Sequence, residues 1–372
     1  MKFIHLGDLH IGKRVNEFSM INDQREILKQ IIKVSKSEKV NGIFIAGDIY
    51  DKTIPSIEAI ELFEDFICKI ADLKIPAYIV SGNHDSSERL STFSKLISLS
   101  GIHFSRNYDG EIIPLPLENI DIWLLPFVRP ADVRRFFPDI EIGNYQDAIE
   151  NVVKNLDIDT SRTNILIAHQ FVTANGKKPE ISDSETSSLG TLDNIDYRIF
   201  DNFDYVALGH IHKPQSMGRK EIRYCGSPLK YSFSEVNQNK SITIVEIEDK
   251  KIDIKSIPFK PIHEMKEIRG KINNLLKMEK DESYMHITLT DTNVIDAKNK
   301  LETIFPNIMK LDFEEYYTNL GEKRDLKTLK EKTIFEHFSD FFEKQTKEKL
   351  TNEEKEMFKR LKEISKFNPR RV

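Results

Sequence analysis

Residues 2–10 read KFIHLGDLH, a short apolar run that ends abruptly in two polar side chains, Asp8 and His10. The same arrangement recurs four more times before residue 213, in the stretches 42–48 (GIFIAGD), 77–84 (AYIVSGNH), 164–169 (NILIAH) and 205–212 (YVALGHIH). Apolar runs of this length that are rich in β-branched residues are typical of buried strands. Each run therefore predicts a strand that is followed at once by a side chain able to bind metal.

Helical patterns separate the early runs. Residues 23–39 carry Ile27, Ile31 and Val34 in helical register, and residues 56–73 show the same spacing of apolar side chains. Because strand and helix alternate, we predict an α/β domain of layered sheets and helices, which we place over residues 1–255. Ligand sites of such sheets lie beyond the carboxyl ends of the strands. The polar ends of all five runs are therefore expected to meet at one rim.

The polar side chains that follow the runs have the chemistry of metal ligands. They are two carboxylates, one amide and four imidazoles: Asp8, His10, Asp48, Asn83, His169, His210 and His212. Divalent metals accept these donors, and a centre of two metals needs about seven of them with one carboxylate shared. Asp48, from the central motif, is the expected bridge. Two divalent metal ions held by only two carboxylates would stay positively charged, so the centre would attract a phosphodiester anion.

The reaction expected of this centre is phosphodiester hydrolysis by in-line attack of a metal-activated hydroxide. The leaving alkoxide needs a proton, and His84, which adjoins Asn83, is the best candidate for a general acid. Asp85 is expected to orient the His84 ring. We therefore predict His84 and Asp85 as the catalytic residues.

The sequence pattern changes after residue 255. A helix over 267–277, a strand over 284–289, a helix over 294–305 with Asn293 as its N-cap, and a strand over 308–313 predict a small α+β domain at 256–320. Residues 327–372 are charged and helical, and an aromatic stripe runs along the first helix at Ile334, Phe335, Phe338, Phe341 and Phe342. Thr351 and Glu354 form a capping box for a second helix. This segment either packs on its own chain or docks to a partner.

Composition excludes several classes of protein. The net charge of −5 over 372 residues argues against wrapping DNA with the whole surface. Lys177–Lys178 and Arg134–Arg135 are either local DNA contacts or solvated surface pairs. No apolar run reaches the length of a membrane span, and Asp8 falls where a signal peptide would need apolar residues. The two cysteines predict neither a disulfide framework nor a thiolate cluster, so we expect a cytoplasmic protein.

The motifs DLH (8–10), GDIYD (47–51), GNHD (82–85), AH (168–169) and GHIH (209–212) resemble those of the calcineurin-like metallophosphoesterases. More narrowly, the chain resembles the nuclease subunits of bacterial SbcCD complexes, and the stretches GTLD (190–193), DYVAL (204–208) and RYCGSPLKYSF (223–233) support that likeness. The resemblance covers most of residues 1–313. It implies that Asp8, His10, Asp48 and His212 hold one metal, and that Asp48, Asn83, His169 and His210 hold the other.

The resemblance also implies manganese as the working metal. Activity is expected as an exonuclease on double-stranded DNA and an endonuclease on hairpins and single strands, in the processing of DNA ends and recombination intermediates. The implied partner is an SMC-like ATPase (SbcC) docked through the C-terminal helices, while the small domain caps the DNA cleft. A homodimer within a heterotetramer is implied as well, with Phe63, Phe66, Leu90 and Phe93 as candidate contacts from helices at 56–73 and 87–100. Burial of these side chains within the monomer is the alternative.

Parts of the sequence are compatible with two other functions. A phosphoprotein phosphatase or small phosphodiesterase would share the metal core, but those phosphatases show Asp-Arg-Gly and Gly-Asn-His-Glu where this chain has Asp51-Lys52-Thr53 and a GNHD motif ending in Asp85. An interaction module without catalysis does not need the intact ligand set. Archaeal and eukaryotic relatives tend to carry His at the position of Asp51, so a role of that His in handling DNA strands is not expected here.

Overall fold

The computed structural model describes residues 1–185, 194–291 and 294–314, and beyond them only Ser339, Phe342, Leu350, Thr351 and Lys355. The chain divides into two units, one of Met1–Leu289 with Asn293–Asp312 and one of Thr290–Thr292 with Phe313–Val372. The first unit holds every element discussed below, except for Phe313, the last residue of β19. The predicted cap at Asn293 and the predicted helices of 327–372, apart from those five isolated positions, lie outside the described residues.

The first of two six-stranded sheets contains the three N-terminal runs. Its strands are ordered β16 (Lys251–Pro258), β15 (Ser241–Glu248), β1 (Lys2–Leu6), β4 (Gly42–Ala46), β5 (Ala77–Val80) and β6 (Ile102–Phe104). From β1 to β6 the strands pair in parallel, whereas β15 pairs antiparallel with both β1 and β16. The carboxyl ends of β1, β4 and β5 therefore lie side by side.

The second sheet contains the two later runs. Its order is β13 (Gln215–Met217), β14 (Arg219–Tyr224), β12 (Tyr205–Gly209), β9 (Thr163–His169), β8 (Ile120–Leu125) and β7 (Leu115–Leu117). The four central strands are parallel, and β7 and β13 are antiparallel edges. This topology places the ends of β9 and β12 next to each other.

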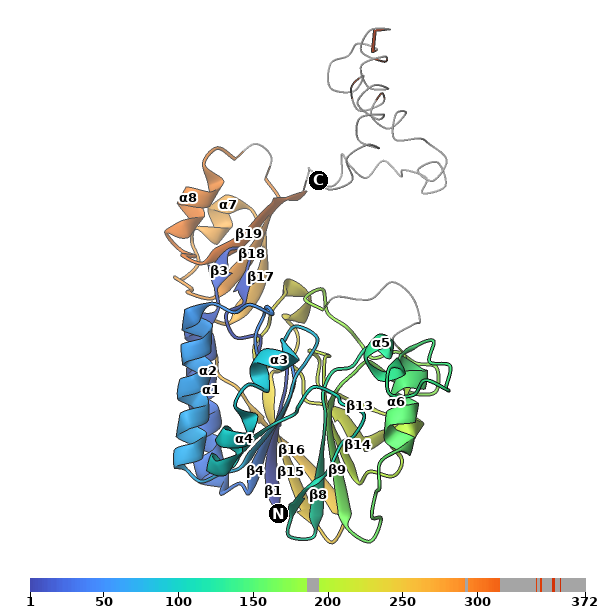
Figure 1. The fold of residues 1–372 in the computed structure, drawn as a ribbon. Coiled ribbons are helices and arrows are strands. Elements are labelled where there is room, and N and C mark those ends of the chain that lie inside the picture. The colour runs from blue at the N-terminus through green and yellow to red at the C-terminus, as the bar shows by residue number, and fades with distance from the viewer. Residues whose placement is uncertain are drawn as a thin grey trace. The chain divides into compact units, whose positions relative to one another are not determined.

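The two sheets pack face to face, with helices on both outer sides (Figure 1). Phe3, Phe44, Ile165 and Tyr205 belong to the buried cluster between the sheets. Alternate residues of the same strands are buried on the opposite face of their sheet, so β1, β4, β9 and β12 are buried on both faces and are largely apolar. The predicted α/β domain of layered sheets and helices is confirmed.

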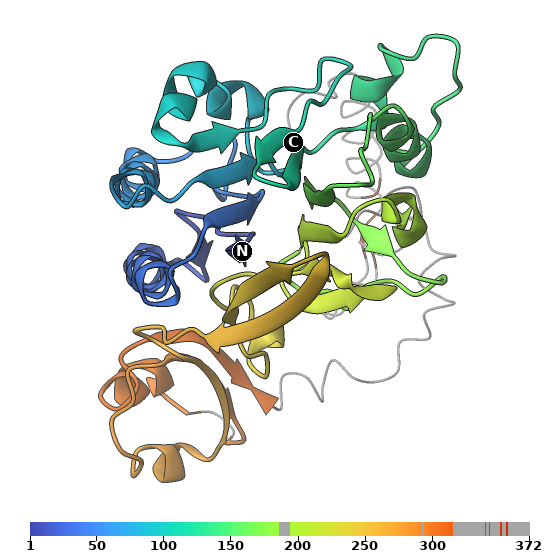
Figure 2. The same cartoon turned by 90° about the horizontal axis from the view of Figure 1, so that it is seen from below.

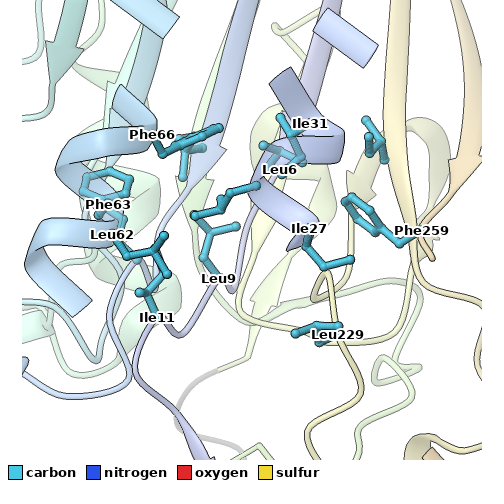
Figure 3. Close-up of a cluster of buried hydrophobic side chains, with 14 of the residues drawn as sticks. Leu6, Leu9, Ile11, Ile27, Ile31, Leu62, Phe63, Phe66, Leu229 and Phe259 are labelled. Carbon is cyan, nitrogen blue, oxygen red and sulfur yellow. The ribbon is translucent and has the colours of Figure 1, made fainter. Parts of the chain in front are cut away.

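Helices α1 (Ile21–Glu38) and α2 (Ile57–Asp72) cover the first sheet, and α6 (Tyr145–Lys154) covers the second (Figures 1 and 2). In Figure 3, Ile27 and Ile31 of α1 and Leu62, Phe63 and Phe66 of α2 point toward Leu6 and Leu9. Both helices agree with the sequence prediction to within about two residues at each end. The Ser56 hydroxyl accepts a hydrogen bond from the Ala59 amide at 3.3 Å and caps α2.

The predicted helix over 87–100 is broken into short pieces. They are α3 (Ser87–Leu90), α4 (Ser94–Ile97) and the 3-10 turn η1 (Ser98–Ser100). Phe93, between α3 and α4, adopts a left-handed conformation with φ 59°, which an α-helix does not accommodate.

Short elements complete the main body. They are β2 (Arg14–Val15), β3 (Phe18–Ser19), α5 (Pro130–Arg134), β10 (Val172–Thr173), β11 (Ile195–Asp196), η2 (Tyr197–Phe200) and η3 (Phe233–Glu235). No helix within the described residues is long and apolar enough to cross a membrane.

A three-stranded sheet ordered β17 (Met265–Gly270), β18 (Tyr284–Leu289) and β19 (Ile308–Phe313) follows, with α7 (Ile272–Leu275) and α8 (Ala297–Glu302). The predicted strands over 284–289 and 308–313 are confirmed. The predicted helix over 267–277 is wrong for its first half, because residues 265–270 pair in parallel with β18 and only Ile272–Leu275 are helical. Met265, Tyr284 and Met309 join the same buried cluster as α1, so this sheet packs on the main body.

Candidate metal centre

Each predicted ligand lies at or just after the carboxyl end of a strand, and the structure brings all seven together. The two sheets meet through the ligands themselves. The Asp8 carboxylate, from the first sheet, accepts a hydrogen bond from the His210 amide of the second at 2.8 Å. The Asn83 side-chain oxygen lies 2.9 Å from Nε2 of His169 and 3.0 Å from Nδ1 of His210. Residues more than 200 positions apart thus share one rim.

One group of donors is formed by Asp8, His10 and His212, whose nearest ligand atoms lie within 4.8 Å of one another. The Nε2 atoms of His10 and His212 are 3.1 Å apart. Asp48 Oδ2 stands 3.6 Å from the same nitrogen of His10. This is the set that the resemblance implies for one metal.

A second group surrounds the other side of Asp48. Its Oδ2 lies 3.4 Å from His169 Nε2, and Asp8, Asp48 and His169 form a further donor triad. His169 Nε2 in turn lies 3.3 Å from His210 Nδ1. Asp48 Oδ2 therefore faces His10 of the first group and His169 of the second, which is the position that a bridging carboxylate would need.

The backbone around these ligands is unusual. Asp8, His10, Asp48 and His210 all have positive φ, at 52°, 43°, 48° and 100°. For residues other than glycine such conformations cost roughly 1–3 kcal/mol each and gather at functional sites. The glycine of the GNHD motif, Gly82, is needed because a Cβ at this position would collide with the Asp48 side chain. The loops after β4 and β5 can approach each other this closely only with a glycine there.

Several buried polar atoms fit a cation. Asp8 Oδ2 and His10 Nδ1 are buried and have no hydrogen-bond partner within the described residues. The Ala46 carbonyl accepts from His169 Nδ1 at 2.8 Å, which leaves Nε2 of that ring facing two other acceptors, Asn83 Oδ1 and Asp48 Oδ2. Burial opposes a charge on the His169 ring, yet Asp48 beside it raises the pKa to about 9. A positive ion shared between these converging nitrogen and oxygen atoms would satisfy them. Atoms of this kind are suitable ligands for divalent metals.

A buried network behind His212 was not predicted from the sequence. Ser184 Oγ accepts from His212 Nδ1 at 2.8 Å and donates to Glu235 at 2.5 Å. Glu235 forms an ion pair of 2.5 Å with Lys240, whose ammonium also donates to the His212 carbonyl at 2.9 Å. Burial alone would raise the pKa of Glu235, but His212 and Lys240 outweigh it and hold the pKa at about 2. The network fixes which nitrogen of His212 faces the site.

The structure corrects the expected role of Asp85. Its carboxylate accepts three backbone hydrogen bonds, from Gly82 at 2.9 Å, Tyr50 at 3.0 Å and Ile49 at 3.1 Å. Burial, followed by the charge of Asp48, raises the pKa of Asp85 to about 6. With its oxygens committed to these amides, Asp85 is not the group that orients the His84 ring. It ties the loop after β4 to the loop after β5.

The His84 ring is held by another residue. Its Nδ1 donates to the main-chain carbonyl of Asp51 at 3.0 Å, and its backbone amide donates to Asp48 Oδ1 at 2.9 Å. The ring lies edge-on to His10, with 4.9 Å between their centres. The Asp51 side chain accepts from Lys13 at 2.7 Å. His84 therefore lies beside the ligand set with Nε2 left for a proton.

The comparisons with known proteins agree with this geometry. Residues 1–214 match the calcineurin-like phosphoesterase family, and residues 261–346 match the family described as type 5 capsule protein repressor C-terminal domain. The chain is 35% identical over 353 residues to the SbcD protein of the SbcCD nuclease from Staphylococcus epidermidis, covering 91% of this chain and 92% of the relative. The protein of the same name from Staphylococcus saprophyticus subsp. saprophyticus is 34% identical over 350 residues, with the same two coverages.

Proposed function

Because the chain belongs to the calcineurin-like phosphoesterases and, within them, to the SbcD nucleases of SbcCD complexes, we propose that its seven rim residues hold two metals that cleave DNA. Membership makes the chain a metal-dependent nuclease, a phosphodiester hydrolase that works with an SbcC partner. The proposed ligands of one metal are Asp8, His10, Asp48 and His212, and those of the other are Asp48, Asn83, His169 and His210. The observation that carries this assignment is the convergence of metal-binding atoms around Asp48. Its Oδ2 lies 3.6 Å from His10 Nε2 and 3.4 Å from His169 Nε2, and Asn83 Oδ1 lies 2.9 Å from the same His169 nitrogen.

The two cations, when bound, would polarise the phosphoryl group and the attacking water. His84 acts beside them as the general acid. Its Nδ1 is tied to the Asp51 carbonyl, so Nε2 of the imidazolium carries the proton that the leaving oxygen needs. Asp85 acts as a positioning residue, since its three backbone bonds join the loops that present Asp48, Asn83 and His84.

The substrate is proposed to be DNA, cut as an exonuclease on duplex ends and as an endonuclease on hairpins and single strands. We propose Mn²⁺ as the metal, which the nitrogen and oxygen donors accept. The small sheet of β17, β18 and β19 would cap the DNA. We also propose that the protein works in the cytoplasm, where reducing conditions would keep the exposed thiol of Cys68 reduced.

The proposed partners are SbcC, reached through residues 327–372, and a second copy of this chain. Exposed apolar side chains support the dimer. Ile57 and Ile60 of α2 are exposed, and so are Phe93, Leu96 and Leu99 in the segment that follows α3. Of the contacts expected from the sequence, Phe93 is among these exposed side chains, whereas Phe63 and Phe66 are buried in the monomer core.

A Mn²⁺-dependent assay on a hairpin DNA, run beside a phosphopeptide, tests the activity. Hydrolysis of the DNA and its loss on chelation are expected; hydrolysis of the peptide alone would refute the nuclease assignment.

Light scattering tests the dimer. The unmodified protein is expected to be dimeric, and a double variant, Phe93→Ser with Leu96→Ser, is expected to be monomeric. A monomeric unmodified protein would remove the dimer from the proposal.

A further inference from the structure

A pocket of about 340 Å³ opens beside Asn83. Its volume lies within the range of about 300–1,000 Å³ that is usual for small-molecule sites. One part of its lining is the loop after β5, including Gly82 and Asn83, and another is the segment from Pro126 to Arg135 that follows β8. The pocket therefore adjoins the Asn83 half of the proposed metal centre.

Two aromatic rings line this pocket, those of Phe127 and Tyr108. The Phe127 amide donates to the Ser81 carbonyl at 3.0 Å, so its backbone is fixed to the loop that carries Asn83. Its ring lies 6.3 Å from the His169 ring, edge to face. Phe127 thus stands between the pocket and a proposed metal ligand.

Two guanidinium groups also line the pocket. Arg129 and Arg135 flank helix α5, and both are exposed. Arg135 stands 3.5 Å from Asp132, a surface pair worth little and easily exchanged for a phosphate. Arg134, between them, donates to the Ile142 carbonyl at 2.7 Å and does not line the pocket. The structure therefore separates the two members of the Arg134–Arg135 pair.

The three carboxylates of the lining each accept hydrogen bonds from neighbouring groups of the chain. Asp85 accepts its three backbone hydrogen bonds, and Asp132 accepts from the Arg129 amide at 3.0 Å. Glu88 accepts from the Ser86 hydroxyl at 3.1 Å. The lining thus offers an incoming group both aromatic faces and guanidinium cations.

We propose that this pocket binds one unpaired nucleotide next to the scissile phosphate, with a phosphate on Arg129 and Arg135 and the base against Phe127 and Tyr108. The proposal rests on the proposed nuclease function and specifies its substrate. Aromatic rings stack on bases of any sequence, and guanidinium groups pair with phosphate. A base inside a duplex is stacked and paired, so it must first leave the helix to enter. The pocket therefore favours single strands and hairpin tips over intact duplex.

The test compares two strands of equal length in Mn²⁺, an oligothymidylate and an abasic strand with the same phosphates. The full chain is expected to cleave the base-containing strand with a kcat/KM about fivefold or more above that of the abasic one. Phe127→Leu should bring this ratio close to one. Phe171→Leu is the matched control. The Phe171 ring lies edge-on to the His210 ring, with 6.0 Å between their centres, in the same way as Phe127 contacts His169. Phe171 does not line the pocket.

A second pair of variants tests the phosphate contact. Arg135→Gln is expected to lower kcat/KM about tenfold on both strands, relative to Arg134→Gln, which removes the same charge from the neighbouring position. If the unmodified chain cleaves neither strand, the nuclease function itself fails. Three other results would overturn the pocket proposal while leaving the nuclease function in place. The unmodified chain could cleave both strands with equal kcat/KM, or Phe127→Leu and Phe171→Leu could lower the ratio to the same extent. The third is an equal kcat/KM for Arg135→Gln and Arg134→Gln.

Discussion

The two six-stranded sheets contribute different chemistry to the same rim. Loops of the first sheet supply both carboxylates, the amide and one imidazole, from Asp8, His10, Asp48 and Asn83. The second sheet supplies imidazoles only, from His169, His210 and His212. The carboxylates that would neutralise the proposed metals therefore come from one sheet, and the other sheet adds only imidazoles. Neither sheet by itself forms a two-metal site, so the centre depends on their packing.

The sheets also position their ligands by different means. In the first sheet the backbone does so: the Asp8 amide donates to the Gly47 carbonyl and the His10 amide to the Asp48 carbonyl, at 3.1 and 2.9 Å. In the second sheet the far ring nitrogen is held, by the Ala46 carbonyl for His169 and by Ser184 for His212. Substitutions that remove a ligand's charge should therefore reduce metal binding most in the first sheet. In the second sheet, metal binding should be reduced most by substitutions of the side chains that support the ligands.

The largest effect is expected from Asp48→Asn. This change removes the carboxylate that is proposed to bridge the two metals, so the Mn²⁺ content should fall below two per chain and turnover by more than about 10⁴-fold. Metal analysis and a hairpin cleavage assay measure the two effects. The control is Asp51→Asn, whose carboxylate pairs with Lys13 and whose backbone carbonyl is retained. Two tightly bound ions together with normal turnover in Asp48→Asn would contradict the bridge.

His84→Gln should separate metal binding from catalysis. Loss of a general acid costs about 10²–10⁴-fold in turnover, while the Mn²⁺ content is expected to remain at two because His84 is not among the proposed ligands. His103→Gln serves as the control, since that ring stacks on Tyr78 away from the rim. Turnover within a few-fold of normal would remove His84 from the mechanism.

The ligands were predictable because they follow strands, and the short strands were recognisable from their apolar runs. Glu235 ends the short 3-10 helix η3 and Lys240 lies in the loop before β15, and no such pattern marks either residue. Their burial behind His212 therefore appears only once the chain is folded. The GNHD motif marks Asp85 as a candidate, but it does not reveal that the three amide partners of Asp85 come from two loops. The strand at 265–270 depends on β18 as its partner, which local sequence does not reveal.

Lys240→Met tests the side-chain support in the second sheet. The change leaves Glu235 buried without its partner, which costs about 3–5 kcal/mol of unfolding free energy. Because the same network holds His212, the Mn²⁺ affinity should fall about 10–100-fold. Denaturant unfolding and Mn²⁺ titration measure the two quantities. Lys230→Met is the control, because Lys230 pairs with the more exposed Glu264. Unchanged Mn²⁺ affinity in Lys240→Met would limit the network to a structural role.

Ser184→Ala should give the smallest effect. It removes a single hydrogen bond from His212 Nδ1, worth about 0.5–1.5 kcal/mol, so the Mn²⁺ affinity should fall about 2–10-fold. Glu235 lies 3.7 Å from the same nitrogen and keeps its ion pair with Lys240, so the ring retains an acceptor. The loss should therefore stay well below that of Lys240→Met in the same titration. If Ser184→Ala and Lys240→Met lose Mn²⁺ affinity equally, the Ser184 hydroxyl and not the Glu235–Lys240 ion pair positions His212. The second sheet would then hold this ligand by one hydrogen bond and not by a network.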